Sequence, residues 1–197
     1  MEANSGAVNI IPARATISTF IRGAAMASII ETNHKVNRAL AAGALALGAE
    51  VEISDRAGYA PLVNAPALMA VARDCMIAVA GEDQVFFTDA WSSGSTDMGD
   101  LSTVIPSVHP YAAGATGSLH GDDCQITDPV KACILSAQAQ VLMAVELLKD
   151  NAARARQVID TFQPVYPSME AYFEAVNQLM SDRDLVTYTG SSATISF

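Results

Sequence analysis

The chain has 197 residues, of which 51% are hydrophobic and 16% charged, and its 21 acidic against 11 basic residues give a net charge of −10. This apolar content suffices for one packed domain or two small ones and excludes a collagen-like or disordered chain. The acidic balance argues against a nucleic-acid partner. Charged and polar residues interrupt every apolar stretch before the roughly 20 residues that a bilayer requires, and the N-terminus lacks a secretory signal pattern. We therefore expect a soluble, cytoplasmic protein without a membrane partner.

The first 56 residues predict a strand, a helix and a second strand. Residues 7–22 are rich in Val, Ile and Thr and carry one proline, which favours an edge strand. Residues 28–47 place apolar side chains at helical spacing among alanines, and Gly48 is a plausible cap. Residues 49–56 alternate apolar and polar side chains, which indicates a half-buried strand.

The remaining residues predict mostly helices separated by two glycine-containing loops. A break in composition at Gly58–Pro61 suggests a domain boundary. The elements expected after it are a helix over 64–80, a short strand over 84–88, a polar loop from 91 to 100, an extended stretch over 104–111, a glycine-rich loop over 114–123, a helix from 128 to about 149, two helices near 151–161 and 168–181, and a Ser/Thr-rich tail.

Candidate chemistry is concentrated in the two loops. His120 lies between Gly117 and Gly121, where an imidazole can approach a metal ion without steric obstruction, and with Cys124 it forms an HxxxC pair. The alternative for His120 is a loop histidine bonded to backbone, which is also how we interpret His34 and His109. The carboxylates of Asp97 and Asp100 either cap nearby backbone or hold a metal ion. The three cysteines, Cys75, Cys124 and Cys133, match no disulfide framework and are expected to be reduced thiols.

No complete catalytic set is visible. The sequence contains no GxGxxG or Walker-type phosphate loop, no GxSxG elbow and no HExxH motif.

Four segments together resemble a known enzyme family. They are NIIPARATISTFIRG (Asn9 to Gly23), YAPLVNAPAL (Tyr59 to Leu68), SSGSTDMGDLSTVIPSVHPY (Ser92 to Tyr111) and GATGSLHGDD (Gly114 to Asp123). In this order and spacing they are similar to the C-terminal part of the co-catalytic zinc amidohydrolases and peptidases, which include aminoacylases, hippurate hydrolases, aminobenzoyl-glutamate hydrolases and glutamate carboxypeptidases. The resemblance covers residues 8 to 180.

The resemblance implies a fold, a domain plan and an assembly. The fold would be an α/β mixture: residues 1–56 would form half of a ferredoxin-like lid (dimerisation) domain, and residues 57–182 the C-terminal half of a zinc-peptidase-like α/β catalytic domain. Residues 183–197 would be a tail. We expect a homo-oligomer, a dimer in the first instance, joined across a two-fold axis by the edge strand over residues 7–22.

The resemblance also implies site residues. His120 matches the last metal ligand of a site that holds two divalent metal ions, zinc or manganese, in the complete family enzyme. Asn9 and Arg22 match residues that grip a substrate carboxylate or amide oxygen, as a carboxamide and a guanidinium can. Gly114 and Gly117 match backbone that lines the substrate pocket. The activity implied is metal-dependent cleavage of an amide bond in N-acyl amino acids or small peptides.

This sequence departs from the family in lacking the other ligands and the general base, which lie upstream of the lid strand in family members. A hydrolytic zinc site needs three protein ligands, a water and a base, so we expect the isolated chain to be inactive and to bind none of these metals by itself. Three hypotheses stay open: an upstream polypeptide supplies the missing half, the chain is a non-catalytic and oligomerising remnant with weak carboxylate binding, or the reading frame begins at an internal methionine.

Overall fold

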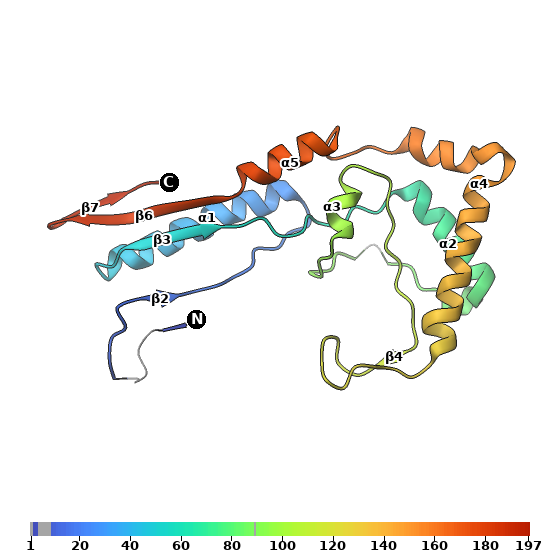
Figure 1. Ribbon diagram of the computed structural model, residues 1–197, viewed down its shortest axis with the longest axis horizontal. Helices are drawn as coiled ribbons and strands as arrows, with labels where there is room; N and C mark the ends of the chain where they lie inside the picture. Colours follow the sequence, from blue (N-terminus) through green and yellow to red (C-terminus); the bar gives the residue numbers. More distant parts are fainter. Residues whose placement is uncertain (1, 4–8, 89) are drawn as a thin grey trace. The chain divides into compact units, whose positions relative to one another are not determined.

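Helices and short strands are divided between two units in the computed structural model, which describes residues 2–3, 9–88 and 90–197 (Figure 1). Unit 1 combines residues 1–53 with residues 183–197, and unit 2 spans residues 54–182. The chain is therefore an α+β mixture, as the sequence predicts at this level. The two domains inferred from the resemblance, with their lid and catalytic identities, stay predictions.

Unit 1 is built on one helix and a three-stranded sheet. Its elements are α1 (Met26–Ala46), β3 (Val51–Asp55), β6 (Ser181–Thr189) and β7 (Ser192–Ile195), with the small pair β1 (Glu2–Ala3) and β2 (Ala15–Thr16); β3 and β6 each extend by two residues into unit 2. Strand β6 lies between β3 and β7 and pairs antiparallel with β7, with Val186 opposite Ile195. The predicted helix and the predicted second strand are confirmed to within a few residues.

The core of unit 1 is small. Its buried members are Ala41 of α1, Ile53 of β3, and Leu185 and Val186 of β6. Consecutive strand residues point to opposite faces, so the burial of both Leu185 and Val186 means that both faces of β6 are covered at this point. Four buried side chains make each of them a large share of what holds unit 1 together.

Two sequence predictions for unit 1 are wrong. Residues 9–22 do not form the predicted long edge strand, because only Ala15 and Thr16 adopt strand geometry, paired with β1; residues 7 and 8 lie outside the described residues. The predicted Ser/Thr-rich tail is a strand pair instead. Strand β6 pairs with β3, which lies more than 120 residues earlier in the sequence, and with β7 through a hairpin. The local sequence pattern therefore could not predict this strand pair.

Unit 2 contains most of the helices. They are α2 (Pro66–Ala80), a 3₁₀ turn (Glu82–Gln84), α3 (Met98–Ser102), a π-helical turn (Val130–Leu135), α4 (Ser136–Thr161) and α5 (Met169–Gln178), and a small sheet joins β4 (Ala115–Thr116) to β5 (Gln125–Ile126). Pro66 opens α2 at a position where its missing N–H costs nothing. Helices α2 and α4 lie side by side (Figure 1). The predicted helices over 64–80 and 168–181 are confirmed, whereas the predicted strand over 84–88 is irregular after the 3₁₀ turn.

Helix α4 is bent sharply near its middle. Asp150, Asn151 and Ala152 have φ values of 51°, 55° and 57°, which is left-handed backbone inside a helical run. Such residues are strained, least so for Asp and Asn and more so for Ala. The sequence predicts one helix ending near Lys149 and another beginning near residue 151, and this bend confirms the division.

The helical run Val130–Thr161 is, by length and composition, able to cross a membrane, and its most apolar window is only 6% buried. Cytoplasmic localisation stays a prediction.

Candidate functional site

The loop that carries His120 is closed by a two-stranded hairpin. Ala115 pairs with Ile126 and Thr116 with Gln125, and the carbonyl of Gly114 accepts hydrogen bonds from the N–H groups of Thr127 and Asp128. Residues 114–128 therefore form a closed turn at the entrance to the long helix.

Glycine is required at two positions of this hairpin. Gly114 and Gly117 have φ values of 106° and 92°, which side chains rarely adopt. A Cβ on Gly114 would lie 2.4 Å from the carbonyl oxygen of Asp128, and one on Gly117 would lie 2.3 Å from that of Asp123. Both glycines, predicted as pocket-lining backbone, therefore hold the shape of the loop; the substrate contact stays a prediction.

His120 lies at the turn of this loop and is exposed. Its own φ is 65°, an uncommon left-handed conformation for histidine. Around it, Ser118 donates its backbone N–H to Oδ1 of Asp123 at 3.0 Å, and the N–H of Gly121 reaches the Ser118 carbonyl at 2.7 Å. Local backbone and the Asp123 carboxylate thus fix the loop, and the imidazole is not part of that bonding. The sequence did not single out this role of Asp123.

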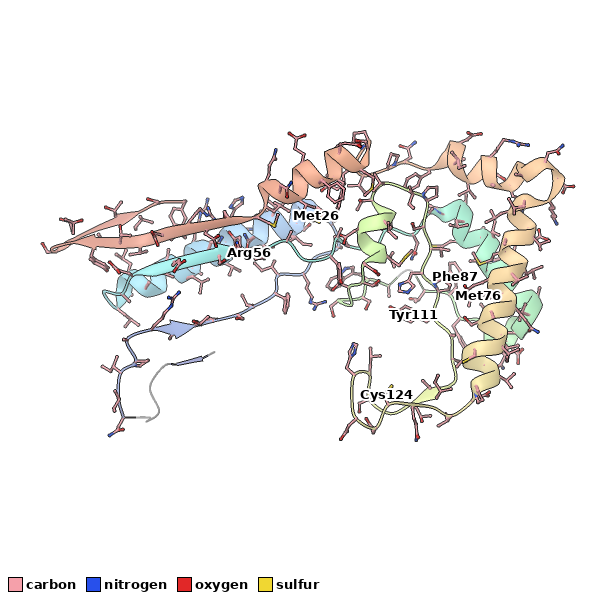
Figure 2. The ribbon with its side chains drawn as sticks, in the orientation of Figure 1. Met26, Arg56, Met76, Phe87, Tyr111 and Cys124 are labelled. Carbon is pink, nitrogen blue, oxygen red and sulfur yellow. The ribbon has the colours of Figure 1, made fainter. Side chains whose placement is uncertain are left out.

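A complete metal site is not formed by the residues that the structure describes. Among them no group of three or more His, Cys, Asp or Glu side chains is placed to hold a metal ion. Cys124, labelled in this loop in Figure 2, is an exposed free thiol, as is Cys133, while Cys75 is free and buried. His120 is therefore one donor, and the residues present do not by themselves fit the two-metal centre implied by the resemblance.

The predicted substrate-binding residues belong to different units. Asn9 and Arg22 are exposed residues of unit 1, and the Arg22 guanidinium lies 5.5 Å from the ring centroid of Phe20. Gly114, Gly117 and His120 belong to unit 2. That these residues share one cleft stays a prediction.

Residues 96–102 hold neighbouring chain segments together through Asp100 and Ser102, whereas Asp97 is exposed and its Oδ1 accepts a hydrogen bond from the Thr96 hydroxyl at 3.0 Å. Oδ1 of Asp100 accepts the N–H of Ala60 at 2.7 Å, and Oγ of Ser102 accepts the N–H of Val63 at 3.0 Å. Gly99 lies so close to the Ala60 carbonyl that a Cβ would be only 1.9 Å from its oxygen. Of the two alternatives for Asp100, the backbone contact is the one observed, although the segment it holds lies 40 residues earlier.

Tyr172 of α5 joins the cluster formed by Asp100 and Ser102 with the backbone of Ala60 and Val63. Burial, and then a hydrogen bond to Asp100, raises the pKa of the Tyr172 hydroxyl to about 12. A phenol that stays neutral to high pH is suited to donating this bond, so the cluster ties α5 to the segment around Ala60.

His109 was interpreted from the sequence as a loop histidine bonded to backbone, but its ring Nδ1 is buried without a hydrogen-bond partner in the described part of the chain. Its backbone N–H donates to Oδ1 of Asn64 at 3.1 Å, and its ring lies 5.6 Å from that of Tyr111. No sequence motif signals this arrangement, because the three residues are brought together by chain contacts outside any helix or strand.

An ion-pair network spans the bend of α4. Arg154 lies 3.7 Å from Asp74 of α2 and 3.2 Å from Glu146, which also pairs with Lys149 at 2.7 Å. The hydrogen bond from Lys149 lowers the pKa of Glu146, and burial raises the pKa of the neighbouring Cys75 thiol. A poorly ionised thiol is a weak nucleophile, so this cluster fastens helices and does not resemble a reactive-cysteine site.

Comparison of this chain with protein-family models, with curated proteins and with solved structures gives no match.

Proposed function

We propose that this chain contributes to metal-dependent hydrolysis of an amide bond in N-acyl amino acids or small peptides, with His120 as one metal ligand. The other ligands and the general base would come from a polypeptide outside these residues. What supports this is the presentation of His120: the hairpin is fastened by Gly114, Gly117 and Asp123, while the imidazole is exposed and takes no part in that bonding.

The presentation of His120 weighs against its structural alternative. A loop histidine kept for packing would be buried or would bond to nearby backbone, yet the hydrogen bonds that shape this turn come from Ser118, Gly121 and Asp123. Holding a donor on a closed loop reduces the conformational entropy lost when it binds. Asn9 and Arg22 are proposed to hold the substrate carboxylate through charge-assisted hydrogen bonds.

The test is complementation by the polypeptide encoded directly upstream. We expect the purified chain with zinc or manganese to leave N-acyl amino acids intact, and the mixture with the upstream polypeptide to hydrolyse them. His120→Ala should abolish this activity and leave the circular dichroism spectrum unchanged. His34→Ala, which removes another exposed histidine from α1, is the matched control and should stay active. Chelator-sensitive turnover by the isolated chain, or an active His120→Ala mixture, would refute the proposal.

A second candidate function is a non-catalytic subunit that self-associates. It is favoured by the accessible surface of the chain, 13722 Å². Two separate compact domains of the masses of the two units would together expose only about 10,600 Å². Absence of activity in every mixture, with self-association retained, would select this candidate.

A further inference from the structure

We propose that the outward face of the helical run Val130–Leu148 binds the same face of a second copy of this chain, as an antiparallel helix pair about a two-fold axis. This inference does not depend on the proposed hydrolase function. Five large apolar side chains lie at three-, four- and seven-residue spacing on this run, and each is between 53% and 69% exposed: Val130, Ile134, Val141, Val145 and Leu148. We call them, with Ala137, the α4 stripe.

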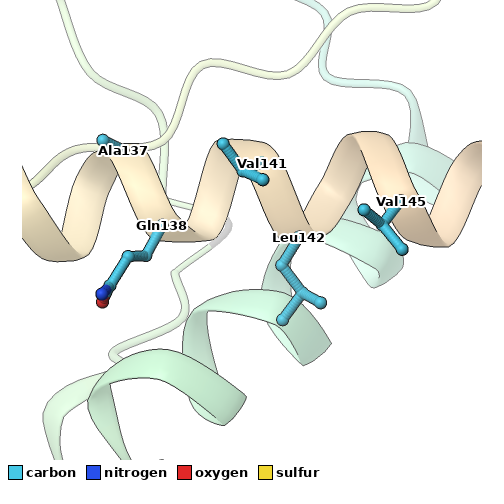
Figure 3. Close-up of a pocket in the computed structure, with 5 residues that line it drawn as sticks. All are labelled: Ala137, Gln138, Val141, Leu142 and Val145. Atoms are coloured by element: carbon cyan, nitrogen blue, oxygen red, sulfur yellow. The ribbon is translucent and has the colours of Figure 1, made fainter.

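The opposite side of the helix is already occupied. Ala139 is buried and Leu142 points toward α2, whereas Ala137 and Val141 point away from it (Figure 3). An open depression of about 330 Å³ is lined by Ala137, Val141 and Val145 of the stripe and is bordered by Gln138 and Leu142. The helix thus has two apolar faces: one packs against α2, and the other is the exposed α4 stripe. A helix that is apolar on both sides normally has both sides buried against other protein surfaces.

The area of the stripe fits a helix pair. Its five large side chains leave roughly 500 Å² of apolar surface in one patch, which equals the largest patch on a typical soluble monomer. Burying it on two copies hides about 1,000 Å², which is the lower bound for a specific protein interface. The run from Val130 to Leu148 is about 27 Å long, long enough for several turns of each helix to interdigitate.

The absence of charge along the α4 stripe suits an equally uncharged partner face, which a second copy of the chain supplies. Each chain carries a net charge of −10, so two copies repel across most of their surfaces. Residues 132–145 contain no Asp, Glu, Lys or Arg, so this face can be buried without desolvating an ion. Pairing about the midpoint of the stripe would place Ala137 of one copy against Val141 of the other, and small opposite large is a good fit in a helix crossing.

A bilayer fits the same helix less well. The uncharged segment is 14 residues long, which spans about 21 Å against the roughly 30 Å of a hydrocarbon core. Lys131 and Glu146 bound it, and the Leu142 side is already packed on α2.

The position also differs from that expected from the sequence, where the dimer was placed on the strand over residues 7–22. Since β2 is only two residues long, it offers little edge to extend, and the α4 stripe is the better surface.

Light scattering coupled to size exclusion tests the proposal on the full chain. At 100 μM protein we expect twice the 20.6 kDa chain mass. Val141→Glu, which places a charge at the centre of the stripe, should give the monomer mass with an unchanged helical circular dichroism signal. Gln140→Glu adds the same charge on an exposed neighbour outside the stripe and should stay dimeric. Should Val141→Glu fail to fold, Leu148→Lys at the end of the stripe serves the same purpose.

Cross-linking tests the antiparallel arrangement. In a Cys124→Ser, Cys133→Ser background, a mixture of the Val130→Cys and Leu148→Cys proteins should form a mixed disulfide more readily than either protein alone. A monomeric wild type would overturn the proposal, as would a dimer that survives both charge substitutions. Flotation of the wild type with phosphatidylcholine vesicles, lost in Val141→Glu, would overturn it in favour of a membrane.

Discussion

Leu185→Ala should lower the free energy of unfolding of unit 1 far more than a substitution of any exposed residue in that unit. The side chain is 0% exposed and is one of the four buried members that the described residues contribute to that core. The substitution removes three carbon atoms, worth about 2.4 kcal/mol at 0.8 kcal/mol each, and the cavity left behind raises the free-energy cost to about 3–4 kcal/mol. A unit of this size has a total stability of about 3–10 kcal/mol, so the loss is a third of it or more.

Leu47→Ala is the matched control, because this leucine belongs to the same unit and is 86% exposed. Its loss should cost about 0.3 kcal/mol. Hydrogen exchange measured by mass spectrometry on peptides covering β6 reports the opening of unit 1, where about 3 kcal/mol accelerates exchange by roughly 100-fold. Trp91, the only tryptophan, lies in unit 2 and reports that unit separately. Acceleration of β6 exchange below threefold, equal to that of Leu47→Ala, would refute the reasoning.

Three further predictions follow from the hairpin, from the buried phenol and from an exposed carboxylate. Gly117→Ala should destabilise the hairpin by about 1–3 kcal/mol, seen as faster amide exchange over residues 115–126, while Gly58→Ala, which meets no atom within 4 Å, should change nothing. In a spectrophotometric titration Tyr172 should ionise near pH 12, because burial raises its pKa. The contribution of the neutral Tyr172 hydroxyl to the free energy of unfolding is complete below the usual tyrosine pKa and is lost as the pH rises toward 12. Ionisation of Tyr172 at the usual tyrosine pKa would contradict this prediction. The hydrogen bond from Ser54 lowers the pKa of Asp182, so Ser54→Ala should raise it in an NMR titration. That contribution is present above the usual aspartate pKa and is lost as the pH falls through the lowered value.

Helices were predictable here because their signals are local. Pro66 at the start of α2, Gly81 after its end and the alanine-rich repeat of α1 are each visible within one window of sequence. The C-terminal strands were not, because β6 owes its place to β3, far away in the chain. The predicted edge strand failed for the converse reason: β-favouring composition is not enough where the described residues offer only the two-residue strand β1 as a partner.

In the candidate site, too, local features were predicted from the sequence and contacts between distant residues were not. The glycine-rich loop predicted around His120 is present, since Gly114 and Gly117 adopt backbone that only glycine adopts readily, but the strand pair that closes it was not predicted. The left-handed backbone of His120 itself and the role of Asp123 follow from the closed turn, which a pattern of residue types does not encode. Asp100 shows the limit most clearly, because its partner Ala60 is 40 residues away and a local capping rule cannot find it.

The left-handed stretch in α4 inverts a familiar rule of protein engineering. Replacing glycine by alanine normally strengthens a helix, and consensus design applies that exchange freely. At Asp150, Asn151 and Ala152 the backbone is one that glycine adopts at least cost, so Ala152→Gly should fix the bend more firmly than any helix-favouring residue. An alanine-rich redesign of this segment would instead favour a continuous helix, and Arg154 would move away from its partner Asp74 on α2.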